Sequence, residues 1–152
     1  GGKTSLLKTI FQIAKKSAHK QAFFFELFPM LIILKQFEVI EKIEKLYYEE
    51  LLTRVNWSFE HKKAFSFIAF SLCAINRGDL KAAEIMLSLI QKNSIENAYL
   101  EYVRLLRCIP AYHLSILQEN AKEAEIQLHQ YECLSKQLHF PFFTEGFIKT
   151  YF

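Results

Sequence analysis

The sequence is poor in the residues that interrupt helices and in those that build phosphate or catalytic sites. Only 4 of its 152 residues are glycine and only 3 are proline. So few glycines exclude a glycine-cradled phosphate site and a turn-rich all-β domain. The only aspartate is Asp79, whose place after Gly78 is explained by helix capping, so a Ser-His-Asp arrangement has no other aspartate to use. These shortages predict an all-helical domain that is not an enzyme.

Cysteine and long apolar runs are also scarce. Cys73, Cys108 and Cys133 cannot all pair with one another, and each lies in an apolar helical stretch, which predicts that all three are reduced core residues of a cytoplasmic protein. His129 lies one helical turn before Cys133, but no further ligands complete a tetrahedral zinc site. The longest apolar run, 22–34, is shorter than the roughly 20 residues that cross a bilayer. We expect no metal, no cofactor and no membrane partner.

Charge is unevenly distributed along the chain. The formal net charge is +3, yet residues 1–25 contain five lysines and no acid, which leaves 14 basic against 16 acidic residues in the remainder. The basic beginning therefore either faces nucleic acid or is a solvated helix. The nearly neutral remainder does not have the charge of a DNA-binding surface.

Apolar residues recur at helical spacing along almost the whole chain, and no segment alternates as a strand does. The spacing predicts eight helices, over 6–13, 23–34, 37–52, 59–76, 80–91, 95–117, 121–138 and 142–152. The breaks contain capping residues, such as Asp79 after Gly78, and Asn120 three residues before Glu123. Breaks this short make consecutive helices antiparallel neighbours, so we expect a row of helical hairpins.

The hairpins repeat with a period near 40 residues. Residues 79–87 align with 120–128 at an offset of 41, with Ala83 and Ala124 in register, and a more diverged copy runs over 37–51. This period is typical of a tetratricopeptide-like, right-handed α-solenoid of antiparallel helical hairpins.

Such solenoids bind ligands on the concave face, which the first helix of each hairpin lines. Two helical stripes there combine aromatic, small and charged residues. The residues assigned to this face are Lys63, Ser66, Phe67, Phe70, Arg77, Glu101, Arg104 and Tyr112. Apolar pockets with an arginine that binds a terminal carboxylate suit a short hydrophobic peptide. The alternative is that Phe67 and Phe70 belong to the core and the arginines are solvated.

The last predicted helix is unusually apolar for the end of a chain. Its aromatic residues either cover the end of the solenoid or pack on a partner subunit, and we expect them to contribute to a homodimer. The residues assigned to dimerisation are Phe142, Phe143, Phe147 and Tyr151.

Three stretches of sequence carry a resemblance to a known family. They are Glu26-Leu27-Phe28 through Phe37-Glu38-Val39-Ile40-Glu41 to Leu51-Leu52, then Ile68 to Asn76-Arg77-Gly78-Asp79-Leu80-Lys81-Ala82-Ala83-Glu84, then Tyr112 to Leu138-His139-Phe140. With them, most of residues 20–152 resembles the C-terminal domain of the Rgg/GadR/MutR transcriptional regulators. The chain departs from that family where Gln118-Glu119-Asn120 and Leu138-His139-Phe140-Pro141 replace turns that usually contain glycine.

The resemblance implies a cytoplasmic regulator with an N-terminal helix-turn-helix domain, which this chain lacks. Residues 1–21 would then be a basic linker helix towards that domain. Residues 22–152 would be a helical-repeat regulatory domain that dimerises and senses a short secreted peptide in quorum sensing, and contact with DNA would occur only through the missing domain. The alternative function is a helical-repeat scaffold for protein–protein interaction, without a small peptide ligand.

Overall fold

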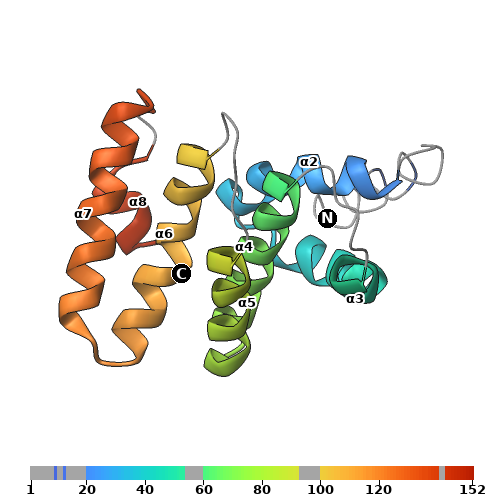
Figure 1. The fold of residues 1–152 in the computed structure, drawn as a ribbon, viewed down its shortest axis with the longest axis horizontal. Helices are drawn as coiled ribbons and strands as arrows, with labels where there is room; N and C mark the ends of the chain where they lie inside the picture. The colour runs from blue at the N-terminus through green and yellow to red at the C-terminus, as the bar shows by residue number, and fades with distance from the viewer. Residues whose placement is uncertain (1–8, 10–11, 13–19, 54–59, 93–99, 141–142) are drawn as a thin grey trace.

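The structure, a computed structural model, describes residues 9, 12, 20–53, 60–92, 100–140 and 143–152 (Figure 1). These ranges contain seven named helices and no strand. The helices are α2 (Lys20–Ile33), α3 (Phe37–Thr53), α4 (Glu60–Asn76), α5 (Leu80–Lys92), α6 (Leu100–Leu117), α7 (Ala121–Gln137) and α8 (Glu145–Lys149). The predicted all-helical class is confirmed for the described residues. None of the helices in these ranges has the length and apolar composition needed to cross a bilayer.

Most helix boundaries agree with the sequence pattern to within a few residues, and the last helix does not. The pattern predicted a helix over 142–152, whereas α8 covers only Glu145–Lys149. Thr144 caps its first turn by accepting a hydrogen bond from the Phe147 amide. After Thr150 the chain leaves the helix and packs against the turn between α2 and α3. The helix predicted over 6–13 lies almost wholly outside the described residues.

Helix α4 lies at the centre of the molecule. It packs against α2, α3, α5 and α6, while α7 packs mainly against α6. Every residue from 64 to 75 is buried, so α4 has no solvent-facing side along three turns. A helix that is apolar all round is stable only inside a protein, which explains why the other helices gather around α4.

The first hairpin runs in a different direction from the others. Figure 1 shows α4, α5, α6 and α7 with similar axes, whereas α2 lies across the view near the upper ends of α4 and α5, and α3 is seen nearly end-on. The contacts α2–α4 and α4–α6 form an inner row, and α3, α5 and α7 follow as the second helices of the hairpins. The hairpin organisation is therefore present, but the change of direction means that these helices do not by themselves establish a regular solenoid.

Four helices end in the same backbone arrangement, with one residue in the left-handed region. These residues are Lys35, Gly78, Glu119 and His139, with φ between 55° and 84°. At each turn this residue and the next donate amide hydrogen bonds to the last turn of the helix. Such a turn satisfies carbonyls that a helix end otherwise leaves unpaired. Only one of the four residues is glycine. The three turns without glycine close with the same pair of amide hydrogen bonds as the Gly78 turn.

The predicted N-caps at two of these turns are confirmed. Asp79 Oδ1 accepts a hydrogen bond from the Ala82 amide at 3.1 Å, and Asn120 Oδ1 accepts one from the Glu123 amide at 3.2 Å. Each cap satisfies an amide in the first turn of the following helix. Together with the left-handed residue just before it, the cap holds two consecutive helices antiparallel with only three residues between them.

The end of the chain is tied to its first described hairpin. The Tyr151 hydroxyl donates a hydrogen bond to the Ile32 carbonyl at the end of α2, and Lys35 Nζ donates to the Thr150 carbonyl at 3.2 Å. The Phe152 ring stacks on Phe37, with 5.7 Å between centroids. Residues more than 110 positions apart in sequence thus close the structure.

The Gly78 turn should depend on its left-handed backbone. A Cβ at Gly78 would meet no atom within 4 Å, so Gly78→Ala adds only the cost of φ +84°, and we expect it to destabilise the protein by about 1 kcal/mol. Gly146 lies inside α8 without a positive φ, so Gly146→Ala should instead stabilise the protein, by about 0.5 kcal/mol. Urea denaturation measures both changes. A Gly78→Ala protein as stable as the original would contradict the assigned turn.

Candidate functional site

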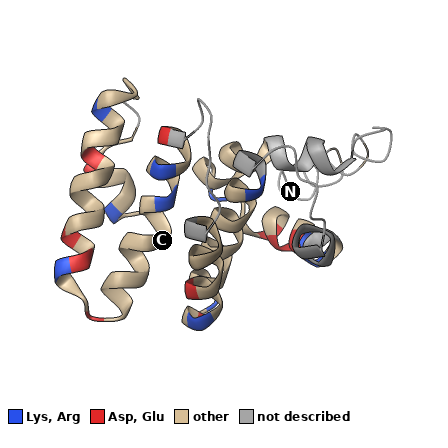
Figure 2. Cartoon of the chain, viewed as in Figure 1, with Lys and Arg blue, Asp and Glu red and all other residues tan. Residues whose placement is uncertain are grey.

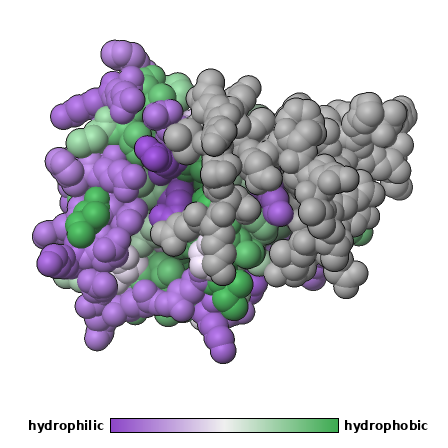
Figure 3. Space-filling view, in the orientation of Figure 1, coloured by the Kyte–Doolittle hydropathy of each residue, from purple (hydrophilic) through white to green (hydrophobic). Residues whose placement is uncertain are grey.

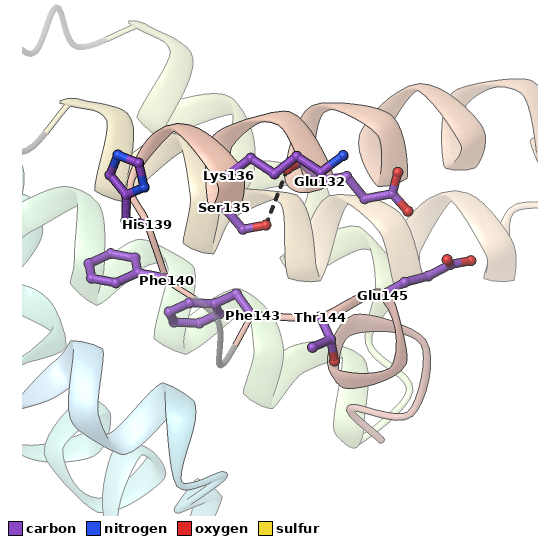
Figure 4. A pocket seen from close by; sticks show the side chains of 8 residues that line it. All are labelled: Glu132, Ser135, Lys136, His139, Phe140, Phe143, Thr144 and Glu145. Atoms are coloured by element: carbon purple, nitrogen blue, oxygen red, sulfur yellow. Dashed lines mark hydrogen bonds between the residues drawn. The ribbon is translucent and has the colours of Figure 1, made fainter.

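An open pocket of about 640 Å³ lies between the end of α7 and the start of α8 (Figure 4). Its lining residues are Glu132, Ser135, Lys136, His139, Phe140, Phe143, Thr144 and Glu145. The rings of Phe140 and Phe143 pack against each other, with centroids 5.6 Å apart, and form the apolar wall. Phe140 is 38% exposed and Phe143 only 6%. Phe140 therefore presents its ring to a molecule that enters the pocket.

The polar groups of the pocket are of two kinds. The hydroxyls of Ser135 and Thr144 already make local backbone hydrogen bonds. The charged side chains Lys136, Glu132 and Glu145 lie towards one end, and the imidazole of His139 lies at the opposite end beside Phe140 (Figure 4). A hydrogen bond and the positive charge of the adjacent Lys149 lower the pKa of Glu145, so this carboxylate is ionised near neutral pH. The pocket is therefore charged towards one end and has an aromatic wall towards the other.

Aromatic contacts from neighbouring helices fix the wall of the pocket. The Tyr102 ring, from the start of α6, packs against Phe140 with centroids 5.7 Å apart and also against Phe65 of α4 at 5.4 Å. On the other side, Tyr131 of α7 packs edge-on against Phe143 at 6.3 Å. The first turns of α4 and α6 and the last turn of α7 therefore meet at the same end of the molecule as the pocket.

The structure places three residues of the predicted peptide-binding face inside the core. Ser66, Phe67 and Phe70 are each at most 1% exposed, and the Phe70 ring packs edge-on against Phe28 of α2, with centroids 5.5 Å apart. The reason is that α2 covers the side of α4 that we expected to face a ligand. A bound peptide cannot touch these three side chains in this arrangement, which corrects their assignment. Lys63 is half-buried, with its ammonium 5.8 Å from the centre of the Phe67 ring.

The charged residues of the predicted face lie at two different places. Lys63, Glu101 and Arg104 belong to the first turns of α4 and α6, and the side chain of Arg104 is exposed. Arg77 lies fourteen residues after Lys63, or about 21 Å further along the chain at 1.5 Å per helical residue. It is exposed at the other end of α4, and the structure does not bring the two arginines together.

Arg77 also has acidic neighbours in its own chain. Burial raises the pKa of Glu44 on α3, and the positive charge of Arg77 partly opposes this rise, while Glu41 adds to it. Arg77 therefore lies close enough to Glu44 of α3 to stabilise its charged form. Tyr112, the remaining residue of the predicted face, is half-buried on α6.

The residues predicted to mediate dimerisation contact their own chain. Phe143 is 6% exposed and Tyr151 is 1% exposed, while Phe147 is half-buried with its ring 5.8 Å from that of Tyr151. Phe142 lies outside the described residues. Of the two possibilities that the sequence left open, covering the end of the helical array is the one seen in this single chain. Phe143 and Tyr151 have too little exposed surface to contact a partner without rearrangement.

The outer helix α7 carries charges of both signs. Figure 2 shows basic and acidic residues interspersed along it, and Figure 3 shows a mostly hydrophilic face there with small hydrophobic patches. Among the described residues, no group of three or more His, Cys, Asp or Glu side chains converges as a metal site would require. His129 Nε2 and Cys133 Sγ are 3.6 Å apart on the exposed side of α7.

Sequence reasoning missed a set of polar atoms buried between α6 and α7. Arg107 Nε, Gln127 Oε1 and the Tyr131 hydroxyl are each buried without a hydrogen-bond partner among the described residues. Burial lowers the pKa of Arg107 and raises that of Tyr131. The α7 residues Glu123, Gln127 and Tyr131 follow at intervals of four, and Gln127 Nε2 donates to Glu123 Oε1 at 2.9 Å. This spacing was the only sequence signal for a polar stripe facing α6.

Comparison with protein-family models, with curated proteins and with solved structures finds no match to this chain. The resemblance to the Rgg/GadR/MutR regulators therefore stays a prediction. Function has to be argued from the side chains described above.

Loss of the hydroxyl group should affect the stability of the protein differently at two buried tyrosines. Tyr151→Phe removes the hydrogen bond to Ile32, and we expect a destabilisation of about 1–2 kcal/mol. Tyr131→Phe removes a buried hydroxyl that has no partner among the described residues, and we expect the stability to stay constant or rise by about 1 kcal/mol. Both variants keep the ring, so each controls for the other in urea denaturation. Equal losses in both would contradict the contacts assigned to them.

One of the three thiols should react quickly in the folded protein. Cys73 and Cys108 are buried as expected, and burial raises the pKa of both, that of Cys108 to about 12. The prediction that Cys133 is a core residue is wrong, because its side of α7 faces solvent. Because the thiolate is the reactive form, Ellman's reagent at pH 8 should titrate one thiol rapidly and all three after denaturation. Cys133→Ser should abolish the rapid phase. Rapid reaction of a second thiol would show that the core opens more readily than its packing indicates.

Proposed function

We propose that this chain is the ligand-sensing and dimerisation domain of a transcriptional regulator, and that it binds a short hydrophobic peptide. The observation that carries this proposal is the pocket beside α8, where the exposed Phe140 ring lies at one end and charged side chains of both signs, Lys136, Glu132 and Glu145, lie towards the other (Figure 4). A peptide offers matching chemistry, because its apolar side chains pack on an aromatic ring while its termini and backbone meet polar groups.

The first turns of α4 and α6 support an extended site. Tyr102 joins these turns to the pocket wall through its contacts with Phe65 and Phe140. The exposed Arg104 lies on α6 close to Tyr102 in sequence and supplies a cation for a peptide carboxylate. In this proposal the domain is a helical-repeat array whose ligand lies across the start of α6 and the end of α7, away from the buried side of α4.

The proposed mechanism follows from linkage. A peptide changes gene expression only if it binds one arrangement of a homodimer more tightly than another. In this proposal the protein is cytoplasmic, residues 1–21 connect the domain to an N-terminal helix-turn-helix domain, and only that domain touches DNA. The resemblance stated above supports this part, and the sequence of the parent protein before residue 1 tests it directly.

Truncation of the exposed ring should weaken peptide binding. We expect Phe140→Ala to raise the Kd for short apolar peptides by at least about tenfold, because an aromatic anchor at the centre of a site typically contributes more than 1 kcal/mol. Arg104→Ala should raise the Kd for peptides with a free carboxyl terminus more than for their amides. Ile126→Ala, at an exposed apolar residue of α7 outside the pocket, is the matched control. Fluorescence anisotropy measures all three.

The pattern of effects decides between sites and functions. Loss of binding in Arg104→Ala with none in Phe140→Ala would move the ligand to the start of α6. A domain that binds no short apolar peptide, yet retains one large protein in a pull-down, would favour the scaffold function. The exposed Ile116 and Leu117 at the far end of α6 are the observation that favours such a scaffold.

A further inference from the structure

The last residues of the chain dock into a well-defined seat. We call residues 147–152 the tail, and Ile32, Lys35, Phe37 and His113 the seat. The Ile32 carbonyl accepts a hydrogen bond from the Tyr151 hydroxyl, and the Phe37 ring packs against both Tyr151 and Phe152. The seat thus recognises a tyrosine followed by a second aromatic residue.

Two cationic or polar side chains complete the seat. Lys35 Nζ donates a hydrogen bond to the Thr150 carbonyl at 3.2 Å and lies 5.1 Å from the centre of the Tyr151 ring. His113 Nε2 is 2.6 Å from the Ile148 carbonyl, and its ring packs edge-on against Phe152 at 4.9 Å. Backbone and ring contacts are combined, which makes the interaction specific for this segment.

The tail begins within a weak element, the short helix α8. Helix α8 has only five residues, one of which is Gly146, and helices this short are not stable without tertiary contacts. Glu145, Gly146, Lys149 and Thr150 are all exposed. Release of the tail costs the burial of Ile148 and Tyr151 and the contact of α8 with α7, so it occurs only if the same contacts form elsewhere. The seat belongs to the turn between α2 and α3 and to α6.

We propose that the seat also accepts the tail of a second copy of this chain, so that two copies exchange tails reciprocally and form a dimer. This inference rests on the dimerisation part of the proposed function. A second copy carries the same tail, so every contact made within one chain can form between two chains. The aromatic residues predicted to mediate dimerisation are buried within one chain. Exchange agrees with both observations, because in the exchanged dimer these residues are buried against the partner.

Exchange leaves the tail–seat contacts unchanged, so the dimer forms by mass action. The seat within one chain meets its tail at a high effective concentration, and the partner's tail competes only when the protein is concentrated. A variant that weakens the contact affects both arrangements equally. A test therefore has to separate the two halves of the contact in different molecules.

Complementation of two defective variants separates them. The seat variant is Lys35→Ala/Phe37→Ala, which retains an intact tail, and the tail variant is Tyr151→Ala/Phe152→Ala, which retains an intact seat. Neither variant can close its own contact, and neither can form a homodimer by exchange. We expect sedimentation velocity to show monomers for each variant alone and heterodimers in an equimolar mixture. The milder pair Lys35→Ala and Phe152→Ala serves if circular dichroism shows loss of helix in the double variants.

A labelled peptide provides an independent readout on the full-length protein. The probe is a fluorescent peptide of residues 145–152, and the control is the same composition in scrambled order. We expect the probe to bind the tail variant at least tenfold more tightly than it binds the original protein, whose own tail fills the seat. The seat variant and the scrambled peptide should show no binding.

The outcomes separate this inference from the dimer itself. If the tail variant alone dimerises as well as the original protein, dimerisation stands and tail exchange is overturned. If all samples, including the mixture, remain monomeric, both are overturned. A folded tail variant that does not bind the probe would show that the seat acts only within one chain.

Discussion

The burial of α4 on every side is the constraint on which the rest of the structure depends. Residues 64–75 have no exposed side chain, so α2, α3, α5 and α6 must all pack around one helix. Such an arrangement leaves no face of the central helix for a ligand along these turns. The side chains that a ligand can reach therefore lie at the ends of the helices, near Tyr102, Phe140 and the tail of the chain. The location of the candidate sites is a consequence of how the core is filled.

The spacing of apolar residues and the capping residues were sufficient to predict the helices and most of their boundaries. Apolar spacing identified the helices, and the caps at Asp79 and Asn120 are the ones the sequence indicates. The turns at Lys35, Glu119 and His139 were harder, because a left-handed residue is recognisable in sequence mainly when it is glycine. These turns close through amide–carbonyl hydrogen bonds, which any residue type supplies. The short α8 was missed because long-range contacts of Tyr151 and Phe152 draw the chain out of the helix.

The site was less predictable for a physical reason. A helical projection shows which residues share a face, but it does not show which distant helix covers that face. Phe67 and Phe70 lie on the same stripe as Lys63, yet contact with α2 makes part of that stripe core. The pocket depends on Phe140 meeting Tyr102, 38 positions earlier in the chain, and no local pattern encodes such a pair. What the sequence did indicate was that an aromatic chain end needs a surface to cover it.

The contact between Lys35 and Thr150 also bears on the order in which the chain folds during synthesis. Lys35 and Thr150 are separated by 115 positions, so at 5–20 residues per second a ribosome needs roughly 6 to 23 s to make the tail after the seat. During this interval the aromatic surface around Phe37 has no tail of its own chain to cover it. Closure of the first hairpin by the Tyr151 and Phe152 side chains is therefore a late event, which follows synthesis of all the other helices.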